Sequence, residues 1–377
     1  MKIAEVTATF PPYHGGVGNV VYHNAKFLAE KGHSVSVFTQ RPKQMRDLGN
    51  LPFSVRYLDS LLTIGNAPLL RQLSASLQGF DLIHLHYPFI FGSETVLYTA
   101  KRRNIPVLLT YHNQLVEQSL MRKFLFGIYN LVVEPQIINH ATYRISVSQD
   151  HFHSLFPGVE STEVPNGVDV NLFSPHERDE ARRILDLPKA APIVLFVGGL
   201  DAAHRFKNVP SLLRAASKLP EAEIIVVGQG ELRKSLVQLA HDLGIAERTR
   251  FDEACPTTRL PLYYSAADVT VLPSNRTESF GMVLAESMAC ETPVIATNLP
   301  GVRRVVRHQE TGLLVPINHD EALHGAMQWM LQHDSERRAM GRAGRMLVQQ
   351  EYSWSVIQDK LEAACLKTVA NHSRYSA

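Results

Sequence analysis

Short apolar runs rich in β-branched residues alternate with amphipathic stretches along most of the chain. The short runs predict strands and the amphipathic stretches between them predict helices. The predicted strands are Ile3–Phe10, Ser34–Phe38, Leu82–Leu85, Val107–Tyr111, Arg144–Val147, Ile193–Val197, Glu223–Val227, Val269–Leu272, Pro293–Ala296 and Gly312–Val315. The predicted helices include Asn19–Glu30, Glu94–Arg103, Val209–Lys218, Glu231–Asp242 and Gly281–Cys290. Continuous apolar strands separated by helices favour an α/β fold with parallel sheets buried on both faces.

The series of strands and helices runs twice along the chain. Residues 164–175, VPNGVDVNLFSP, gather Pro, Asn, Gly and Asp, so we expect the seam between two domains there. The predicted domains cover residues 1–168 and 169–353. Open α/β sheets bind ligands at the carboxyl ends of their strands, so a cleft between the domains is the expected site.

Composition narrows the function classes. The 377 residues are 45% hydrophobic and 20% charged, which predicts a folded core rather than a disordered chain. The net charge of +2 argues against a dominant nucleic-acid binder. The three cysteines lie far apart without a CxxC pair, which argues against a disulfide scaffold or a cysteine zinc site.

The chain carries no pattern of a signal peptide or a membrane span. Its longest apolar stretch, residues 124–133, contains Asn130 and falls well short of the ~18 residues that a span needs. We therefore expect a cytoplasmic protein. Residues 121–126, MRKFLF, and the basic residues 101–103 leave two interpretations. They form a patch that contacts anionic lipid at the inner membrane face, or their large apolar side chains belong to the core, which is the more general behaviour.

The first loop that could bind a ligand is Gly15-Gly16-Val17-Gly18, between the first strand and a helix. Glycines there let the backbone approach an anion, and a helix N-terminus offers unpaired N–H groups. The simpler interpretation is a tight turn. A dinucleotide fingerprint would need a third glycine near Val21, and a GxxxxGK[ST] phosphate loop is absent.

The second loop, residues 198–209, also follows a strand. It brings Arg205 and Lys207 together beside His204, and two cations there suit a diphosphate group. An ordinary solvated basic turn is the alternative interpretation.

The third segment, residues 274–290, carries the sharpest pattern. Ser279 is expected to cap a helix that starts at Phe280 or Gly281, and Gly281 keeps the first turn open to a phosphate. Glu286 falls on the second turn among apolar residues, where a carboxylate needs a partner such as a ribose diol. Glu278 precedes the helix, where it could meet a sugar's hydroxyl groups. The alternative is that Glu286 faces water.

Three histidines stand at predicted strand ends. His112 follows the strand Val107–Tyr111, and its position fits a ligand or catalytic contact as well as a local hydrogen bond. His84 and His86 are expected to satisfy backbone groups. A zinc site built from the three lacks a carboxylate at familiar spacing, so we expect no metal.

These segments resemble those of the large retaining group of GT-B glycosyltransferases, known as family four. Glu278-x7-Glu286 within ESFGMVLAESMA matches the EX7E motif of that family. The GGVG loop, TYH at residues 110–112, PNGVD at 165–169, VGQG at 227–230, and TPVIAT followed by LPGV also match, in family order over nearly the whole chain.

The resemblance implies two Rossmann-like domains, an N-terminal one on the acceptor side and a C-terminal one that binds the nucleotide sugar. The last helix, from about Trp354, would pack back on the first domain. It also implies transfer of a hexose-type sugar from a nucleotide diphosphate-sugar with retained configuration, without a cofactor and usually without a metal. The expected acceptor is a glycan or lipid-linked glycan in cell-surface polysaccharide or glycolipid synthesis.

The resemblance also implies roles for individual residues. Glu286 would hold the ribose, Glu278 the hydroxyl groups of the donor sugar, and Lys207 the diphosphate. His112 would lie near the reacting carbon. The groups expected close to donor oxygens are Gly16 and the amides of Phe280, Gly281 and Met282.

Two positions depart from the family pattern. Gly199 stands where an arginine is common, and we hypothesise that Arg205 supplies the missing cation. Glu291 stands where glycine is common before TPVIAT, which is acceptable only if that helix end needs no left-handed residue. Three other functions stay open on the same scaffold: a nucleotide-sugar epimerase, a phosphorylase, and a non-catalytic subunit that binds nucleotide sugars. The intact glutamate pair and Lys207 argue against the last.

Overall fold

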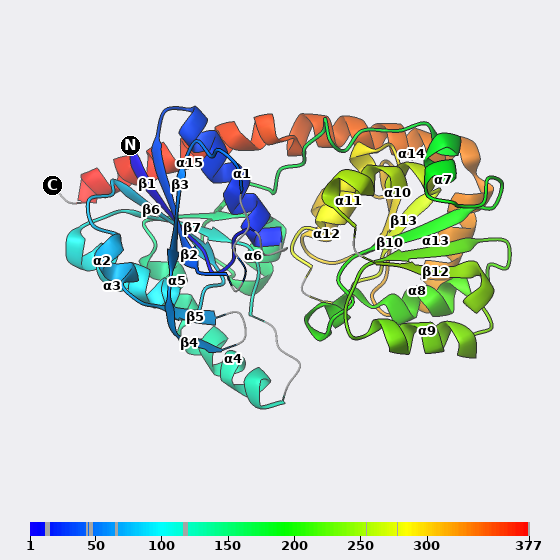
Figure 1. The fold of residues 1–377 in the computed structure, drawn as a ribbon, viewed down its shortest axis with the longest axis horizontal. Helices are drawn as coiled ribbons and strands as arrows, with labels where there is room; N and C mark the ends of the chain where they lie inside the picture. The colour runs from blue at the N-terminus through cyan, green and yellow to red at the C-terminus, as the bar shows by residue number, and fades with distance from the viewer. Residues whose placement is uncertain are drawn as a thin grey trace. The chain divides into compact units, whose positions relative to one another are not determined.

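The computed structural model describes residues 1–11, 16–42, 44, 48–64, 67–115, 120–253, 255–276 and 278–375. The chain divides into two compact units (Figure 1). Unit 1 comprises Met1–Asn166 and Ile357–Ala377, and unit 2 comprises Gly167–Val356. These limits lie two or three residues from the predicted bounds. The chain first passes from unit 1 to unit 2 after Asn166, inside the expected seam.

Unit 1 is built on a parallel sheet with the strand order β3-β2-β1-β6-β7-β8-β9. Its strands are β1 (Lys2–Val6), β2 (Ser34–Gln40), β3 (Ser54–Leu58), β6 (Leu82–Tyr87), β7 (Val107–Tyr111), β8 (Tyr143–Ser146) and β9 (Thr162–Glu163), and β4 (Ser60–Ile64) pairs with β5 (Ala67–Leu70) in an antiparallel hairpin. The register places Glu5 beside His84, and His86 beside Thr110. Polar residues of three strands therefore become neighbours inside this sheet.

Helices complete unit 1. They are α1 (Gly16–Glu30), α2 (Leu73–Ser76), α3 (Gly92–Arg103), α4 (Leu120–Val132), α5 (Glu134–His140), α6 (Gln149–Leu155) and the final helix α15 (Trp354–Tyr375), which enters unit 1 at Ile357. The core packs the apolar faces of α3 and α5 against β1, β6 and β7, with Val96, Ile137 and Leu109 at most 1% exposed.

Unit 2 repeats the plan with the order β12-β11-β10-β13-β14-β15, again all parallel. Its strands are β10 (Ile193–Val197), β11 (Glu223–Val227), β12 (Thr249–Asp252), β13 (Val269–Leu272), β14 (Val294–Thr297) and β15 (Gly312–Val315). Its helices are α7 (Arg178–Ile184), η1 (Ala202–Lys207), α8 (Val209–Ala216), α9 (Arg233–Asp242), η2 (Ala246–Arg248), η3 (Thr257–Arg259), α10 (Leu260–Ala266), α11 (Met282–Ala289), α12 (Val302–Val305), α13 (Asp320–Gln332), α14 (Asp334–Leu347) and η4 (Val348–Tyr352).

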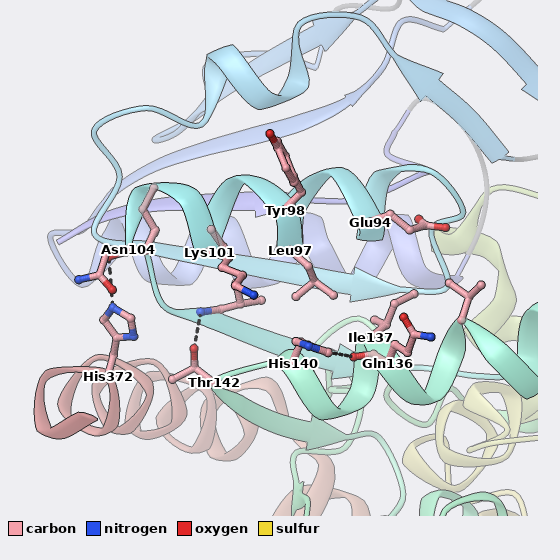
Figure 2. Close-up of a pocket in the computed structure, with 14 residues that line it drawn as sticks. Glu94, Leu97, Tyr98, Lys101, Asn104, Gln136, Ile137, His140, Thr142 and His372 are labelled. Carbon is pink, nitrogen blue, oxygen red and sulfur yellow. Dashed lines mark hydrogen bonds between the residues drawn. The ribbon is translucent and has the colours of Figure 1, made fainter. Parts of the chain in front are cut away.

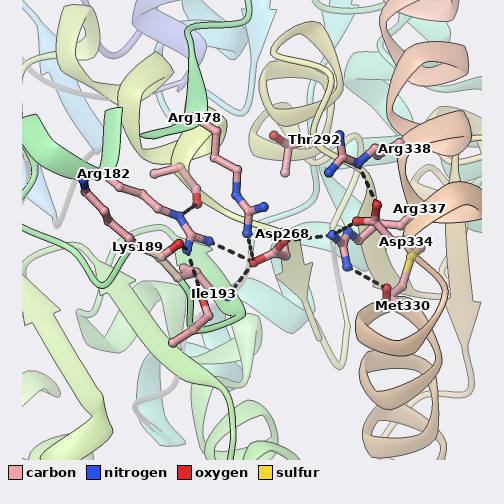
Figure 3. Close-up of polar contacts among 12 residues, drawn as sticks. Arg178, Arg182, Lys189, Ile193, Asp268, Thr292, Met330, Asp334, Arg337 and Arg338 are labelled. Carbon is pink, nitrogen blue, oxygen red and sulfur yellow. Dashed lines mark hydrogen bonds and ion pairs between the residues drawn. The ribbon is translucent and has the colours of Figure 1, made fainter. Parts of the chain in front are cut away.

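One buried carboxylate ties the helices of unit 2 to its sheet (Figure 3). Asp268 accepts hydrogen bonds from Arg178 at 2.7 Å, Arg182 at 3.0 Å and the amide of Ile193 at 2.8 Å. Arg337 of α14 lies 3.1 Å from the same side chain. A buried carboxylate is costly without such partners. This cluster therefore fixes α7 and α14 against the amino-terminal ends of β10 and β13, the two central strands of the sheet.

Both sheets reverse their strand order at one place, between β1 and β6 in unit 1 and between β10 and β13 in unit 2. Open α/β sheets bind their ligands at the carboxyl ends of the strands beside such a switch point. The loops after β10 and β13 carry Lys207 and Glu278, and β1 and β6 carry Glu5 and His86. The α/β class with two parallel sheets is confirmed.

The predicted strand bounds hold where the apolar run is continuous, as at Ile193–Val197, Glu223–Val227 and Val269–Leu272. β3, β9, β12 and the β4–β5 hairpin were not predicted, since each mixes polar or half-exposed positions into a short run. No helix among the described residues is long and apolar enough to cross a membrane.

Candidate active site

The loop after β10 folds into η1, which presents Lys207 at its last position. The backbone amide of Asn275 donates to the carbonyl of Phe206 at 2.8 Å, so this loop is joined to the one that follows β13. The ammonium of Lys207 lies 3.2 Å from Oε2 of Glu278, and each of the two side chains is 12% exposed. Ser274 donates to the same oxygen at 3.4 Å. A cation and a carboxylate that keep some exposure at a switch point remain able to bind a polar ligand.

Glycines let the backbone around Glu278 come close to its neighbours. Gly301 adopts a φ of 92°, and a Cβ there would lie 2.4 Å from the carbonyl oxygen of Ser279. Gly281 adopts a left-handed φ of 77° and is the residue that precedes α11. The expectation that Ser279 caps this helix is therefore wrong: α11 begins at Met282, and no side chain caps it. Gly281 takes that position because a left-handed φ disfavours residues with a Cβ.

Glu286 stands on the second turn of α11 and is half-buried. The fully buried Tyr264 of α10 donates its hydroxyl to Oε2 of Glu286 at 2.7 Å. Burial raises the pKa of Glu286, while the Tyr264 hydrogen bond and the charge of Lys207 act in the opposite direction. Glu286 is thus within electrostatic reach of Lys207 and holds one oxygen against Tyr264. We call Lys207, Tyr264, Ser274, Glu278 and Glu286 the donor cluster.

Unit 1 holds a second polar group, the histidine cluster, formed by Glu5, His84, His86, Thr110 and His112. All five side chains are at most 4% exposed. The contacts within the cluster form one continuous series: Thr110 Oγ1 to His84 Nε2 at 2.6 Å, His84 Nδ1 to Glu5 Oε1 at 3.0 Å, Glu5 Oε2 to His86 Nε2 at 2.7 Å, and His86 Nδ1 to His112 Nε2 at 3.0 Å.

The pKa values of Glu5, His86 and His112 decide which members of the histidine cluster are charged. Burial alone would raise the pKa of Glu5, but its contacts with His84 and His86 lower it to about 2. Burial lowers the pKa of His86 to about 4, and burial together with the other two histidines lowers the pKa of His112 well below its usual value. Glu5 is therefore ionised and His86 and His112 are neutral near pH 7.

The expectation that His84 and His86 satisfy backbone groups is wrong, since their partners are side chains. The carboxylate that the sequence did not place beside them is Glu5, whose oxygens lie close enough to both histidines to form a three-ligand set. Glu5 is far away in sequence, and only the parallel pairing of β1 with β6 brings it there.

The structure places the remaining predicted residues as follows. Phe280 is buried, and Met282 is half-buried at the start of α11. Arg205 is exposed on η1, and its side chain has no partner among the described residues. Gly16 is the exposed first residue of α1 in unit 1, and Gly15 lies outside the described residues. Lys207, Glu278 and Glu286 are thus brought together in unit 2, while His112 and Gly16 belong to unit 1.

Several residues of these clusters were not found from the sequence. Tyr264 lies in a segment without a motif, and Ser274 begins the segment 274–290 but is not part of its motif. Their hydroxyl groups gain a role only through their contacts with Glu286 and Glu278. Glu5 had a usable signal: it is an acidic residue within the apolar strand IAEV, where a carboxylate is expensive unless it is partnered.

The two departures from the family pattern also have local explanations. A Cβ on Gly199 would lie 2.7 Å from Nδ1 of His204, and that nitrogen lies 2.8 Å from Oδ2 of Asp201. The space next to Gly199 is therefore already filled. Glu291 adopts a φ of 61°, so this helix end does take a left-handed residue, contrary to the condition stated for it.

The interpretation that residues 121–126 belong to the core is wrong for Phe124 and Leu125, whereas Phe126 is half-buried. Phe124 and Leu125 of α4 are 70% and 55% exposed, and the side chains of Met121, Arg122 and Lys123 lie outside the description. The exposed apolar face of α4 comprises Phe124, Leu125, Ile128, Leu131 and Val132.

A pocket of about 510 Å³ in unit 1 lies apart from both clusters (Figure 2). It opens between α3 and α5, where Leu97 and Ile137 line it, and His372 of α15 closes one end by a hydrogen bond to the carbonyl of Asn104. None of the predicted site residues lines it.

Comparisons with known proteins agree with this architecture. The family model described as Glycosyltransferase Family 4 matches residues 14–172, and the one described as Glycosyl transferases group 1 matches residues 177–346. D-inositol 3-phosphate glycosyltransferase from Thermomonospora curvata is 32% identical over 92% of this chain and 89% of its own. The protein of the same name from Thermobispora bispora is 31% identical over 92% and 88%.

Solved structures show the same fold. Sucrose-phosphate synthase from Thermosynechococcus elongatus has a TM-score of 0.85 at 27% identity and covers 98% of this chain and 99% of its own. Anabaena HepE, solved with UDP-glucose, has a TM-score of 0.78 at 20% identity, with coverage of 96% and 98%, and shows likeness of fold alone. The matches over both units and along nearly the whole sequence place the chain in glycosyltransferase family 4, also called group 1, with the GT-B fold class and a nucleotide sugar as the sugar donor.

Proposed function

We propose that this protein transfers a hexose-type sugar from a nucleoside diphosphate-sugar to a hydroxyl group of an acceptor, with retained anomeric configuration. The observation that carries the proposal is the donor cluster: Lys207 contacts Glu278 at 3.2 Å and its charge acts on Glu286. One cation between two carboxylates suits a ligand that has a diphosphate in the middle and hydroxyl groups at both ends.

Glu286 binds the ribose in this proposal. Tyr264 occupies one of its oxygens, and the carboxylate keeps acceptor capacity for the two hydroxyl groups of a ribose. Glu278 binds hydroxyl groups of the donor sugar at the other end of the ligand. When the diphosphate binds, we expect Lys207 to exchange part of its contact with Glu278 for phosphate oxygens.

The chemical step needs charge stabilisation on the leaving group. As the bond from the sugar to the diphosphate breaks, negative charge grows on the bridging oxygen, and Lys207 together with the amides at Phe280, Gly281 and Met282 stabilises it. The acceptor hydroxyl attacks the oxocarbenium-like sugar from the same face and gives its proton to the departing phosphate. We propose no metal or organic cofactor, because these groups supply the charge that the leaving group requires.

The hypothesis that Arg205 assists Lys207 follows from its position. Arg205 is exposed on η1, two residues before Lys207, so it can reach a bound diphosphate without breaking a side-chain contact to another described residue. Arg205→Ala should weaken diphosphate binding. Unchanged affinity for the donor in this variant would end the hypothesis.

For the acceptor we propose a lipid-linked glycan at a membrane surface. The exposed apolar face of α4 carries five large side chains, with Leu131 79% exposed, and Lys101 and Arg102 on α3 are exposed cations of the same unit. Such a combination suits contact with anionic lipid. The second candidate is an inositol phosphate, which the names of the two relatives above favour.

A panel of nucleotides tests the donor. UDP, GDP, ADP and their sugars are compared by thermal shift, since the nucleotide that binds raises the melting temperature. The best donor is then incubated alone and with each acceptor. A glycosylated acceptor supports the proposal, whereas a new nucleotide sugar without acceptor would indicate an epimerase. Nucleotide binding without turnover of any donor would indicate a binding subunit.

Flotation tests the membrane surface. The protein should float with vesicles that contain anionic lipid at low salt, and Phe124→Ser with Leu131→Ser should abolish flotation. Leu366→Ser, which changes an exposed leucine on α15, is the matched control. No flotation of the unchanged protein would remove the membrane surface from the proposal and leave the soluble inositol phosphate as the acceptor to test.

A further inference from the structure

The mechanism above leaves the interior of the histidine cluster without a role. Its outer member, His112, follows β7 at the carboxyl edge of the sheet, and its inner members are fully buried. A polar chain of this kind is expensive to bury unless every donor meets an acceptor. The protons can therefore be assigned one contact at a time.

The assignment begins at Glu5. An ionised carboxylate only accepts hydrogen bonds, so the nitrogen of His86 that lies 2.7 Å from Glu5 Oε2 must carry a proton. That nitrogen is Nε2. Neutral imidazole has one N–H and one bare nitrogen, and His86 is neutral near pH 7 because burial lowers its pKa. Its Nδ1 is therefore bare.

The bare Nδ1 of His86 lies 3.0 Å from Nε2 of His112. Two bare nitrogens at this distance would form no hydrogen bond, so Nε2 of His112 carries the proton. His112 is neutral as well, which leaves its Nδ1 bare and able to accept. Within the described part of the chain, no hydrogen bond uses that Nδ1.

We propose that Glu5 and His86 are positioning residues that fix His112 in the Nε2–H form, so that its Nδ1 accepts a hydrogen bond from a hydroxyl group of the donor sugar or the acceptor. This rests on the proposed function and on the expectation, implied by the family resemblance, that His112 lies near the reacting carbon. The opposite tautomer would offer a donor to hydroxyl groups that need an acceptor. A protonated imidazole would place a positive charge beside an oxocarbenium-like centre and raise the energy of that centre.

A metal bound by Glu5, His84 and His86 would use the same atoms. It would require removing the proton from His86 Nε2 and His84 Nδ1, and these protons already make contacts of 2.7 and 3.0 Å with Glu5. Hydrogen bonds alone satisfy the three groups, so the chain of protons accounts for them without an ion.

Two variants with the same number of side-chain heavy atoms separate the positioning role of His86 from its packing role. In His86→Asn the side-chain Oδ1 takes the place of Nδ1 and still accepts from His112, while the distant contact with Glu5 is lost. His86→Leu has the same branched shape and the same number of side-chain heavy atoms and also loses that contact, but it offers no acceptor. Both should destabilise the fold, and thermal unfolding measures by how much. Only His86→Leu should release the tautomer of His112.

The tautomer is read directly by long-range ¹H–¹⁵N correlation spectra of protein labelled at histidine, with His112 assigned from a His112→Gln spectrum. We expect a protonated Nε2 and a bare Nδ1 in the unchanged protein and in His86→Asn, and a mixture or the Nδ1–H form in His86→Leu. In kinetics, His86→Leu should lower kcat by roughly 10- to 100-fold, the scale of one buried hydrogen bond, with a smaller change in KM. His86→Asn should recover most of this loss.

A protonated Nδ1 on His112 in the unchanged protein would overturn the proposal, as would metal bound to the purified protein at the three inner residues. Equal kcat in His86→Leu and the unchanged protein would overturn it too. The spectra decide the tautomer even if no donor is turned over, so failure of the proposed function and failure of this inference give different results.

Discussion

The donor cluster in unit 2 and the histidine cluster in unit 1 both stand at the switch point of a parallel sheet, yet they differ in how their polar groups are satisfied. Lys207 and Glu278 keep about an eighth of their side chains exposed and have one close ionic contact with each other. Glu5, His84 and His86 are buried, and both carboxylate oxygens and all four ring nitrogens have a hydrogen-bond partner. A site that must exchange partners with a ligand is left open, whereas one that holds a side chain in a fixed state is closed.

The two clusters also respond to protons in opposite directions. Burial raises the pKa of Glu286, so its folded form holds a proton more tightly than the unfolded chain does. The contacts with two histidines lower the pKa of Glu5, and burial lowers that of His86. The same physical term, removal from water, therefore acts on a carboxylate in one cluster and on an imidazole in the other.

The largest effect is expected at the donor cluster. Lys207→Ala and Glu278→Ala should each lower kcat by about 100- to 1,000-fold, since each removes a group that stabilises charge or orients the sugar in the transition state. Steady-state kinetics with the identified donor measures this. Lys218→Ala, which removes an exposed lysine paired with Glu321 in the same unit, is the control and should leave kcat unchanged. Near-normal turnover in both test variants would contradict the account of this cluster.

A smaller effect is expected from the residue that orients Glu286. Tyr264→Phe removes only the hydroxyl that contacts Glu286 at 2.7 Å. Because the carboxylate keeps its place on α11, the donor KM should rise by roughly 3- to 10-fold, the scale of one hydrogen bond, with kcat little changed. Initial rates over a range of donor concentrations separate the two constants. A fall in kcat as large as that of Glu278→Ala would mean that Tyr264 acts in the chemical step.

The histidine cluster should set the response of stability to acid. Between pH 6.5 and about 4 the unfolded chain binds a proton at His86 that the folded chain does not, so the free energy of unfolding falls as the pH falls. Glu5 adds a further loss between pH 4.5 and about 2. Urea unfolding at pH 7 and pH 5 measures the first window. The free energy of unfolding should differ less between pH 7 and pH 5 in His86→Asn than in the unchanged protein. An equal difference in both proteins would contradict the assignment.

The smallest effect concerns a helix end. Glu291 adopts a left-handed φ of 61°, which disfavours a residue with a Cβ. Glu291→Gly should raise the free energy of unfolding by about 1 kcal/mol. Asn318→Gly, at a φ of 56° where asparagine is well tolerated, should gain less. Urea unfolding compares the two, and a larger gain at Asn318 would contradict the explanation.

The donor cluster could be predicted because the chain carries much of it in short segments. Glu278 and Glu286 lie on one loop and the helix that follows it, and Lys207 follows a strand of continuous apolar residues. The strands that form the middle of each sheet could be predicted for the same reason. Their two buried faces leave an uninterrupted apolar run that ends at the loop.

The histidine cluster could not be assembled from local pattern. Glu5 and His86 are separated by 81 positions, and only the parallel register of β1, β6 and β7 makes them neighbours. The start of α11 was misplaced for a related reason. A serine before an apolar helix is the usual capping signal, but here Gly281 takes the left-handed position next to Leu284, which no local preference reveals.

The binding of a nucleoside diphosphate and its 2′,3′-dideoxy analogue to the unchanged protein and to Glu286→Gln, measured by titration calorimetry, tests the central claim most directly. If Glu286 holds the ribose, the unchanged protein should bind the dideoxy analogue at least about 100-fold more weakly than the natural nucleotide, the scale of two hydrogen bonds to a charged group. Glu286→Gln should lose most of that preference. Equal binding of both nucleotides by the unchanged protein, or an undiminished preference in Glu286→Gln, would contradict the assignment of the donor cluster.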